Sequence, residues 1–145
     1  MQMRTGAIRP WAYGWVAALA LVWNLLGLAM FVIQATMDEA RLATLSEADR
    51  QIYLATPPWL LVLFGAGVIG GVLGAVGLLA RRRWAVPMFA VSLLAVVVQF
   101  AGSYALTPAW QAYGPAGLAM PVLVLVIAAA LWIYAGRCRA RGWLR

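Results

Sequence analysis

Four long apolar stretches dominate the chain, and short polar segments separate them. The stretches cover about residues 11–35, 59–80, 84–104 and 117–135. About 20 residues of helix cross the hydrocarbon core of a bilayer, and a spanning segment must satisfy its own backbone hydrogen bonds. The pattern therefore predicts an all-α fold, a bundle of four transmembrane helices that forms a single domain over residues 1–145.

Composition argues against a soluble protein. Of the 145 residues, 66% are hydrophobic and only 10% are charged. A soluble domain of this size has too little interior to hide so much apolar surface. Arg4 and Arg9 precede the first stretch, as in a secretory signal, but that stretch is longer than the apolar region of a signal and ends without a small-residue cleavage site. We expect it to be a retained helix.

The polar segment 36–58 is predicted to contain short helices. It holds all four acidic residues of the chain and two sequences with the pattern of a capping box, residues 36–39 and 46–49. A partial apolar stripe runs through it, formed by Leu42, Leu45, Ile52 and Tyr53. We expect one or two amphipathic helices on the periplasmic surface of the membrane, which act either as a cap over the bundle or as a lid or docking element.

The positive charges predict the topology. All eleven are arginines, and nine of them flank the apolar stretches on one side of the predicted membrane, where no acidic residue lies. By the positive-inside rule, this side, with both termini, is cytoplasmic. The arginines predicted to set topology and contact lipid headgroups are Arg81, Arg82 and Arg83 in a tight turn, and Arg137, Arg139 and Arg141 in a basic tail over residues 136–145. We therefore expect the lipid bilayer, and no nucleic acid, as their partner.

Residues for catalysis are missing from the predicted helices. No ionisable side chain lies within their cores, although proton-coupled carriers generally need one. The chain has no histidine and a single cysteine, Cys138, so neither a metal site nor an intrachain disulfide is expected. With no pair of nucleophile and base and no phosphate-binding loop, we expect no cofactor and no enzymatic activity.

Neutral polar residues share faces of the first and third predicted helices. Asn24 and Gln34 fall on one face of the first, and Gln99 and Ser103 on one face of the third. If these faces meet, the polar side chains either hydrogen-bond across the helices or line a pocket for a small neutral solute. The candidate ligand-binding residues are Trp23, Asn24, Gln34, Gln99 and Ser103.

The second predicted helix is rich in glycine. Two overlapping pairs, residues 67 and 71 and residues 70 and 74, have the spacing that lets another helix backbone approach closely. The candidate packing residues are Gly67, Gly70, Gly71, Gly74 and Gly77. They serve either packing within the bundle or assembly into a homodimer or a larger membrane complex.

Several of these motifs point to one group of proteins. Trp23-Asn24-x-x-Gly27, Pro58-Trp59, Gly70-Gly71-x-x-Gly74 and the run from Leu78 to Pro87 are followed by Ser92-Leu93-Leu94 and Gln99. This set resembles a group of small uncharacterised bacterial inner-membrane proteins with about four predicted helices, whose members often carry the automatic label "sugar transporter". The resemblance covers about residues 23–99. It implies a bacterial inner membrane and favours transport.

Two functions remain open from the sequence, and we favour the first over the second. The first is an accessory or scaffold subunit that assembles through the glycine-rich second helix. The second is a transporter or channel for a small neutral solute, which uses the polar residues of the first and third helices. Exposed glycines on the second helix would favour the first function, and an accessible cavity at Asn24 would favour the second.

Overall fold

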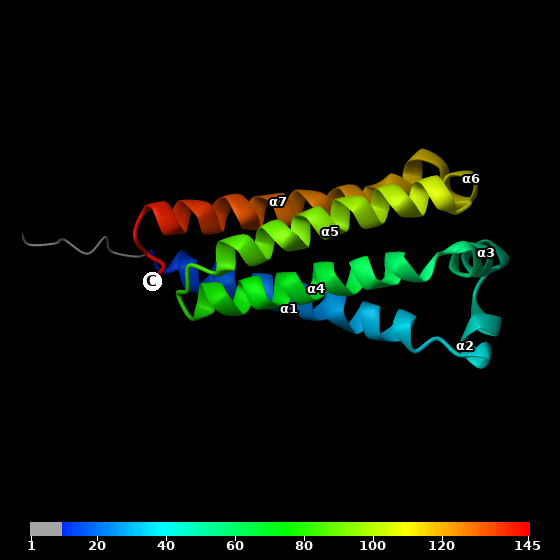
Figure 1. Ribbon diagram of the computed structural model, residues 1–145, viewed down its shortest axis with the longest axis horizontal. Coiled ribbons are helices and arrows are strands. Elements are labelled where there is room, and N and C mark those ends of the chain that lie inside the picture. The colour runs from blue at the N-terminus through cyan, green and yellow to red at the C-terminus, as the bar shows by residue number, and fades with distance from the viewer. Residues whose placement is uncertain (1–9) are drawn as a thin grey trace, which may run out of the picture.

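The computed structural model describes residues 10–145, which form helices and no strand. Within this range, four segments are long and apolar enough to cross a membrane, and Figure 1 shows them as a bundle. Their long helices are α1 (Ala12–Ala35), α4 (Pro58–Leu79), α5 (Ala85–Leu106) and α7 (Ala119–Ala140). The predicted all-α bundle of four transmembrane helices is confirmed, and the chain is a multi-pass integral membrane protein.

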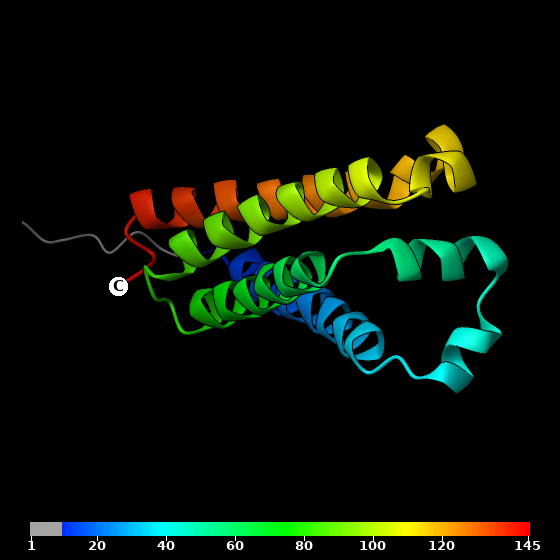
Figure 2. The ribbon, with the colours of Figure 1, turned by 45° about the vertical axis from the view of Figure 1, so that its right-hand side comes forward.

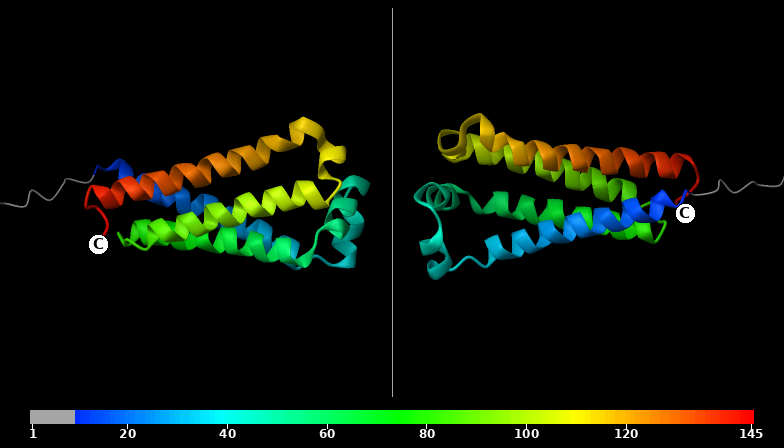
Figure 3. Two further views of the ribbon diagram at one scale, coloured as in Figure 1. Left: turned by 45° about the horizontal axis from the view of Figure 1, so that its top comes forward. Right: turned by 180° about the vertical axis from the view of Figure 1, so that it is seen from behind.

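The long helices pack in sequence order. α1 packs on α4, α4 on α5, and α5 on α7. Residue 145 and the α4–α5 turn lie at one end of the bundle, here called the arginine end, and the short helices lie at the other, here called the loop end (Figure 1). The pair α1 and α4 and the pair α5 and α7 spread apart towards the loop end (Figure 2). Views from two other sides show the same arrangement (Figure 3).

The glycines of α4 explain its central place. Gly67, Gly70, Gly71, Gly74 and Gly77 are all buried. A Cβ atom at any of the five would be in tight contact with a neighbouring helix. The side chains they face are Val96 at Gly67, Ser92 at Gly70, Asn24 at Gly71, Phe89 at Gly74 and Ala85 at Gly77. Packing within the bundle thus accounts for the whole predicted set, and none of the five glycines is left on the surface for a second chain.

The last helix differs from its predicted range. α7 begins at Ala119 rather than 117, because Gly117 belongs to a 3-10 turn, η1 (Gly114–Leu118), and it continues to Ala140 rather than 135. Arg137 and Arg139 therefore lie in its last turn, where positive side chains interact favourably with the helix dipole. The segment predicted as a basic tail begins as helix.

The chain beyond α7 folds back into the bundle. Gly142 has a φ of 74°, and the amide of Trp143 donates to the carbonyl of Cys138 at 3.0 Å, the geometry of a Schellman C-cap. Trp143 and Leu144 are then buried. The segment predicted as a basic tail therefore ends in two buried residues, because apolar side chains favour burial over exposure.

Backbone hydrogen bonds fasten this segment to the α4–α5 turn. The amide of Arg83 donates to the carbonyl of Arg145 at 2.9 Å, and the amide of Arg145 donates to the carbonyl of Arg81 at 2.7 Å. Arg81 itself has a φ of 59°, a conformation that costs an L residue roughly 1–2 kcal/mol. The pairing with Arg145, and a bond from Arg81 Nε to the carbonyl of Trp143 at 3.2 Å, help to hold it there.

Tyr13 joins three helices at the arginine end. Its hydroxyl, on α1, donates to the carbonyl of Leu78 near the end of α4. Its ring lies 6.3 Å from that of Tyr134 on α7 and 6.2 Å from that of Trp143. Together with the buried residues around them, these aromatic rings close the bundle at this end.

The loop end carries α2 (Glu39–Thr44), α3 (Glu47–Ala55) and α6 (Ala109–Tyr113). Ser46 caps α3 as predicted, since its Oγ accepts from the amide of Asp49 at 3.1 Å. The capping box predicted from Thr36 is wrong. Asp38 caps α2 by accepting from the amide of Arg41 at 2.8 Å, because the Thr36 hydroxyl already donates to the carbonyl of Val32 at 2.7 Å in the last turn of α1.

The glycine packing predicts opposite effects for two Gly→Ala substitutions. At Gly74, the new Cβ would lie 2.7 Å from ring carbons of Phe89, so Gly74→Ala should destabilise the protein by about 1–3 kcal/mol. At Gly136 in α7, no atom lies within 4 Å of the added Cβ, so Gly136→Ala should be neutral or stabilising by up to about 1 kcal/mol. Unfolding in mixed detergent and SDS micelles, followed by circular dichroism, measures both. Equal effects would contradict the packing described.

The Tyr13 hydroxyl predicts a second stability effect. Tyr13→Phe should lower the free energy of unfolding by about 0.5–1.5 kcal/mol, because the substitution leaves the ring in place and removes the hydrogen bond to Leu78. Tyr113→Phe is the matched control, since Tyr113 is 44% exposed and its variant should unfold like the wild type. The same micelle titration compares the two. A Tyr13→Phe protein as stable as the control would show that the bond is not needed for closure.

Candidate binding cavity between the four long helices

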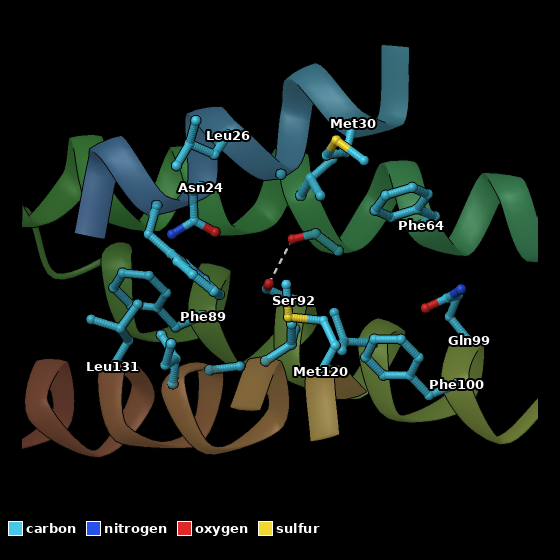
Figure 4. Close-up of a pocket in the computed structure, with 18 of the residues that line it drawn as sticks. Asn24, Leu26, Met30, Phe64, Phe89, Ser92, Gln99, Phe100, Met120 and Leu131 are labelled. Atoms are coloured by element: carbon cyan, nitrogen blue, oxygen red, sulfur yellow. Dashed lines mark hydrogen bonds between the residues drawn. The ribbon is translucent and has the colours of Figure 1, made fainter. Parts of the chain in front are cut away.

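A cavity of about 450 Å³ lies among α1, α4, α5 and α7. Figure 4 shows α1 on one side of it and α7 on the opposite side, with α4 and α5 between them. All the residues that line it are uncharged, and most are apolar or glycine. Its polar side chains are Asn24, Gln34, Ser92 and Gln99. The two polar faces predicted from the sequence therefore line one cavity.

The polar side chains are spread along the cavity and do not form a cluster. Asn24 and Gln99 lie towards opposite ends, with Ser92 between them (Figure 4). Asn24 Nδ2 donates to the carbonyl of Ala20 at 2.8 Å, and Gln99 Nε2 donates to Ser103 Oγ at 3.3 Å. The prediction of a hydrogen bond between the two amides across the helices is wrong, because each amide bonds within its own helix.

Asn24 lies against the glycine face of α4. A Cβ at Gly71 would overlap its Oδ1 atom, so only glycine at this position leaves room for the amide. Its only hydrogen bond described is the one to Ala20. The second N–H therefore remains available to a ligand, whereas Oδ1 packs against Gly71. Asn24 is half-buried, which suits a group that both packs and binds.

Ser92, rather than Asn24 or Gln99, makes a polar contact between two helices. Its hydroxyl donates to the carbonyl of Gly67 at 2.6 Å, and the side chain is buried. This bond ties α5 to α4 at the middle of the cavity, as the dashed line in Figure 4 shows. The hydroxyl proton is thus committed, and Ser92 can only accept a further bond.

Two of the three remaining predicted site residues line the cavity, and the third lies beside it. Trp23 and Gln34 line the cavity as predicted, whereas Ser103 does not line it and only supports Gln99. No feature of the sequence indicated the contribution of α7, which includes Met120, Ile127 and Ala128. Its stretch is apolar on every side, so no polar residue marked the face that turns inwards.

The cavity has one closed and one open boundary. Phe89, which is 2% exposed, belongs to the buried cluster at the arginine end. By contrast, Leu26 and Met30 on α1 and Met120 on α7 also line the cavity, yet each is at least 60% exposed. The cavity is therefore open between the facing sides of α1 and α7.

The predicted topology residues gather at the arginine end. Arg82, Arg83, Arg137, Arg139 and Arg141 are all exposed there. Arg141 lies over the ring of Trp143, with 5.1 Å from the guanidinium carbon to the ring centroid, a cation–π contact. Within residues 10–145, every acidic side chain lies between residues 38 and 49, towards the loop end, so these arginines face no carboxylate side chain.

Comparison with protein families, curated proteins and solved structures finds no match to this chain. The fold and the cavity by themselves define the class, a small integral membrane protein with four transmembrane helices around an uncharged cavity.

The contact between Asn24 and Gly71 predicts a coupled stability effect. Gly71→Ala should be strongly destabilising, by about 1–3 kcal/mol, because the new methyl group meets the Asn24 amide. Asn24→Ala should relieve most of this cost, so the double variant should be more stable than Gly71→Ala alone. Unfolding titrations of both single variants and the double variant complete the cycle. Additive effects would show that the two residues do not touch.

Proposed function

We propose that the protein binds a small uncharged molecule in the central cavity and carries it across the membrane by facilitated diffusion. The supporting observation is the cavity itself, whose 450 Å³ falls in the range of small-molecule sites, about 300–1,000 Å³. Its lining has a few polar groups placed among apolar side chains, as such sites usually do.

The lining favours an uncharged ligand. Burying a charge without a partner in the hydrocarbon region is costly, and the cavity offers only amide and hydroxyl groups as partners. No ionisable side chain lines it within the described chain, so coupling to a proton gradient has no residue to act through. Movement down the ligand's own gradient is the mode that this lining supports.

The closed arginine end indicates to which side of the membrane the cavity is closed. We place this end in the cytoplasm of a bacterial inner membrane, since the positive-inside rule assigns it there and the resemblance noted above implies that membrane. The structure then corresponds to a state closed to the cytoplasm by Tyr13, Tyr134 and Trp143. Carriage across the membrane requires these rings to separate.

We no longer favour the accessory or scaffold subunit, the function that ranked first from the sequence. That hypothesis relied on the glycines of α4 for contact with a second copy or a larger complex. All five glycines face α1 or α5 inside the bundle. The cavity at Asn24 supports the binding of a ligand instead.

Two alanines of α7 provide a matched test of the cavity. Ala128 lines it, whereas the nearby Ala130 is exposed and does not. In nanodiscs, melting temperatures should be measured with a panel of uncharged compounds comprising glycerol, glucose, oleyl alcohol and 1-oleoylglycerol. A compound that binds the cavity and is present at a concentration of 100 times its Kd should stabilise the wild type by about 2.7 kcal/mol.

The two variants should separate a cavity ligand from a nonspecific one. Ala130→Phe should keep the stabilisation of the wild type, and Ala128→Phe should lose it, because the ring fills the cavity. Melting without any compound shows that both variants are folded. If no compound stabilises the wild type, or if Ala128→Phe responds like Ala130→Phe, the cavity is not a binding site for these classes.

A further inference from the structure

A second apolar groove, also of about 450 Å³, lies between α1 and α7. Its lining from α1 includes Val16, Leu19 and Val22, and its lining from α7 is Ile127 and Leu131. Every residue that lines it is apolar. The groove faces outwards in the part of the bundle that crosses the membrane, so hydrocarbon is the solvent in front of it.

The groove and the central cavity are continuous. They share four lining residues, namely Trp23, Leu26, Ile127 and Leu131. α1 and α7 approach each other through Tyr13 and Tyr134 at the arginine end, but they are not among the helix pairs with extensive packing in the described chain. A molecule dissolved in the bilayer therefore has a path between these helices into the cavity.

The polar groups of the site suit a ligand with few hydrogen-bonding groups. Ser92 has already committed its proton to Gly67, and one N–H of Asn24 is committed to Ala20. A monosaccharide carries a hydroxyl group on most of its carbons, and many of these would remain unpaired in this lining. Unpaired buried hydroxyl groups weaken binding. An amphiphile with one or two polar groups and an apolar body matches the lining better.

The positions of the polar groups indicate how such a ligand lies. Gln34 is the second-to-last residue of α1, which ends at the loop end, and Gln99 lies towards the same end of the cavity (Figure 4). Gln34 is therefore near the boundary of the membrane, where lipid headgroups lie, and Gln99 lies deeper, about two helical turns before the end of α5. The central cavity connects these amides with the groove, which runs along α1 from Leu26 to Val16 towards the arginine end. An alkyl chain could follow this path between apolar side chains.

The charges at the two ends favour an uncharged head. The four acidic side chains lie in the segment just beyond Gln34, and they would repel an anionic headgroup. Arg41 and Arg50 lie in the same segment, so four acidic residues face two arginines there and the segment is net negative. The other arginines of the described chain, such as Arg137 in the last turn of α7, lie at the opposite end of the bundle. A neutral head beside the two glutamines is compatible with both features.

We propose that the ligand is an uncharged single-chain amphiphile, of the class of monoacylglycerols and long-chain alcohols, which enters sideways from the bilayer between α1 and α7. Its head lies beside Gln34 and Gln99, and its chain lies in the groove. This proposal rests on the proposed function, since it names the ligand of the central cavity and the route by which the ligand reaches it.

A photoreactive ligand tests the proposal in the intact protein. 1-Oleoylglycerol with a diazirine in its acyl chain is added to the protein in nanodiscs and irradiated, and the labelled residues are identified by mass spectrometry. Labelling is expected at the groove, around Leu26 and Ile127, in excess of the exposed outer faces of α1 and α7. Unlabelled 1-oleoylglycerol should compete for the groove signal.

Two pairs of variants locate the chain and the head. Ile127→Trp should block the groove and reduce its labelling about tenfold, whereas Ile133→Trp, on the same helix but 50% exposed and outside both cavities, should not. Gln99→Leu should weaken the competing affinity about threefold to tenfold, equivalent to one hydrogen bond. Gln111→Leu, at an exposed position, should leave it unchanged. Melting of each variant without ligand shows that it is folded.

The outcomes separate this proposal from the one on which it rests. Uniform labelling of the lipid-facing surface, insensitive to Ile127→Trp and to competitor, would overturn sideways access by an amphiphile. In that case, stabilisation of the wild type by glycerol or glucose that is lost in Ala128→Phe would keep the proposed function and reject the amphiphile. Loss of both responses would reject both.

Discussion

The close approach of α4 to its neighbours is the constraint on which the rest of the structure depends. Glycines at 67, 70, 71, 74 and 77 let α5 and α1 lie against the α4 backbone. In a membrane, helices gain little from hiding apolar surface from one another, so close packing and hydrogen bonds between helices carry the association. The bond from Ser92 to the carbonyl of Gly67 forms at such an approach.

The same constraint explains why there is a cavity. α4 is the helix on which both α1 and α5 pack, whereas α7 packs on α5. α1 and α7 are therefore held together at the arginine end, where Tyr13, Tyr134 and Trp143 meet, and are left apart further along. A space lined by apolar side chains and a few amides results, and it is open where α1 faces α7.

The sequence predicts the fold better than the site. Hydrophobic length alone identifies the four helices, and spacing alone places Asn24, Gln34 and Gln99 on faces that do line one cavity. Spacing cannot show whether two amides on different helices meet, because that depends on how far the helices spread. Trp143 and Leu144 lie in an arginine-rich segment, so their burial could not be predicted from the sequence. The inward face of α7 has no polar residue to mark it.

Native mass spectrometry of the protein released from bilayers tests the central claim most directly, because it detects whatever the cavity retains. If the cavity is a binding site, the wild type should carry an uncharged small molecule as a stoichiometric adduct, and Ala128→Phe, which fills the cavity, should not. A wild-type protein free of any adduct, or an adduct retained equally by Ala128→Phe, would contradict the claim that this cavity is a binding site.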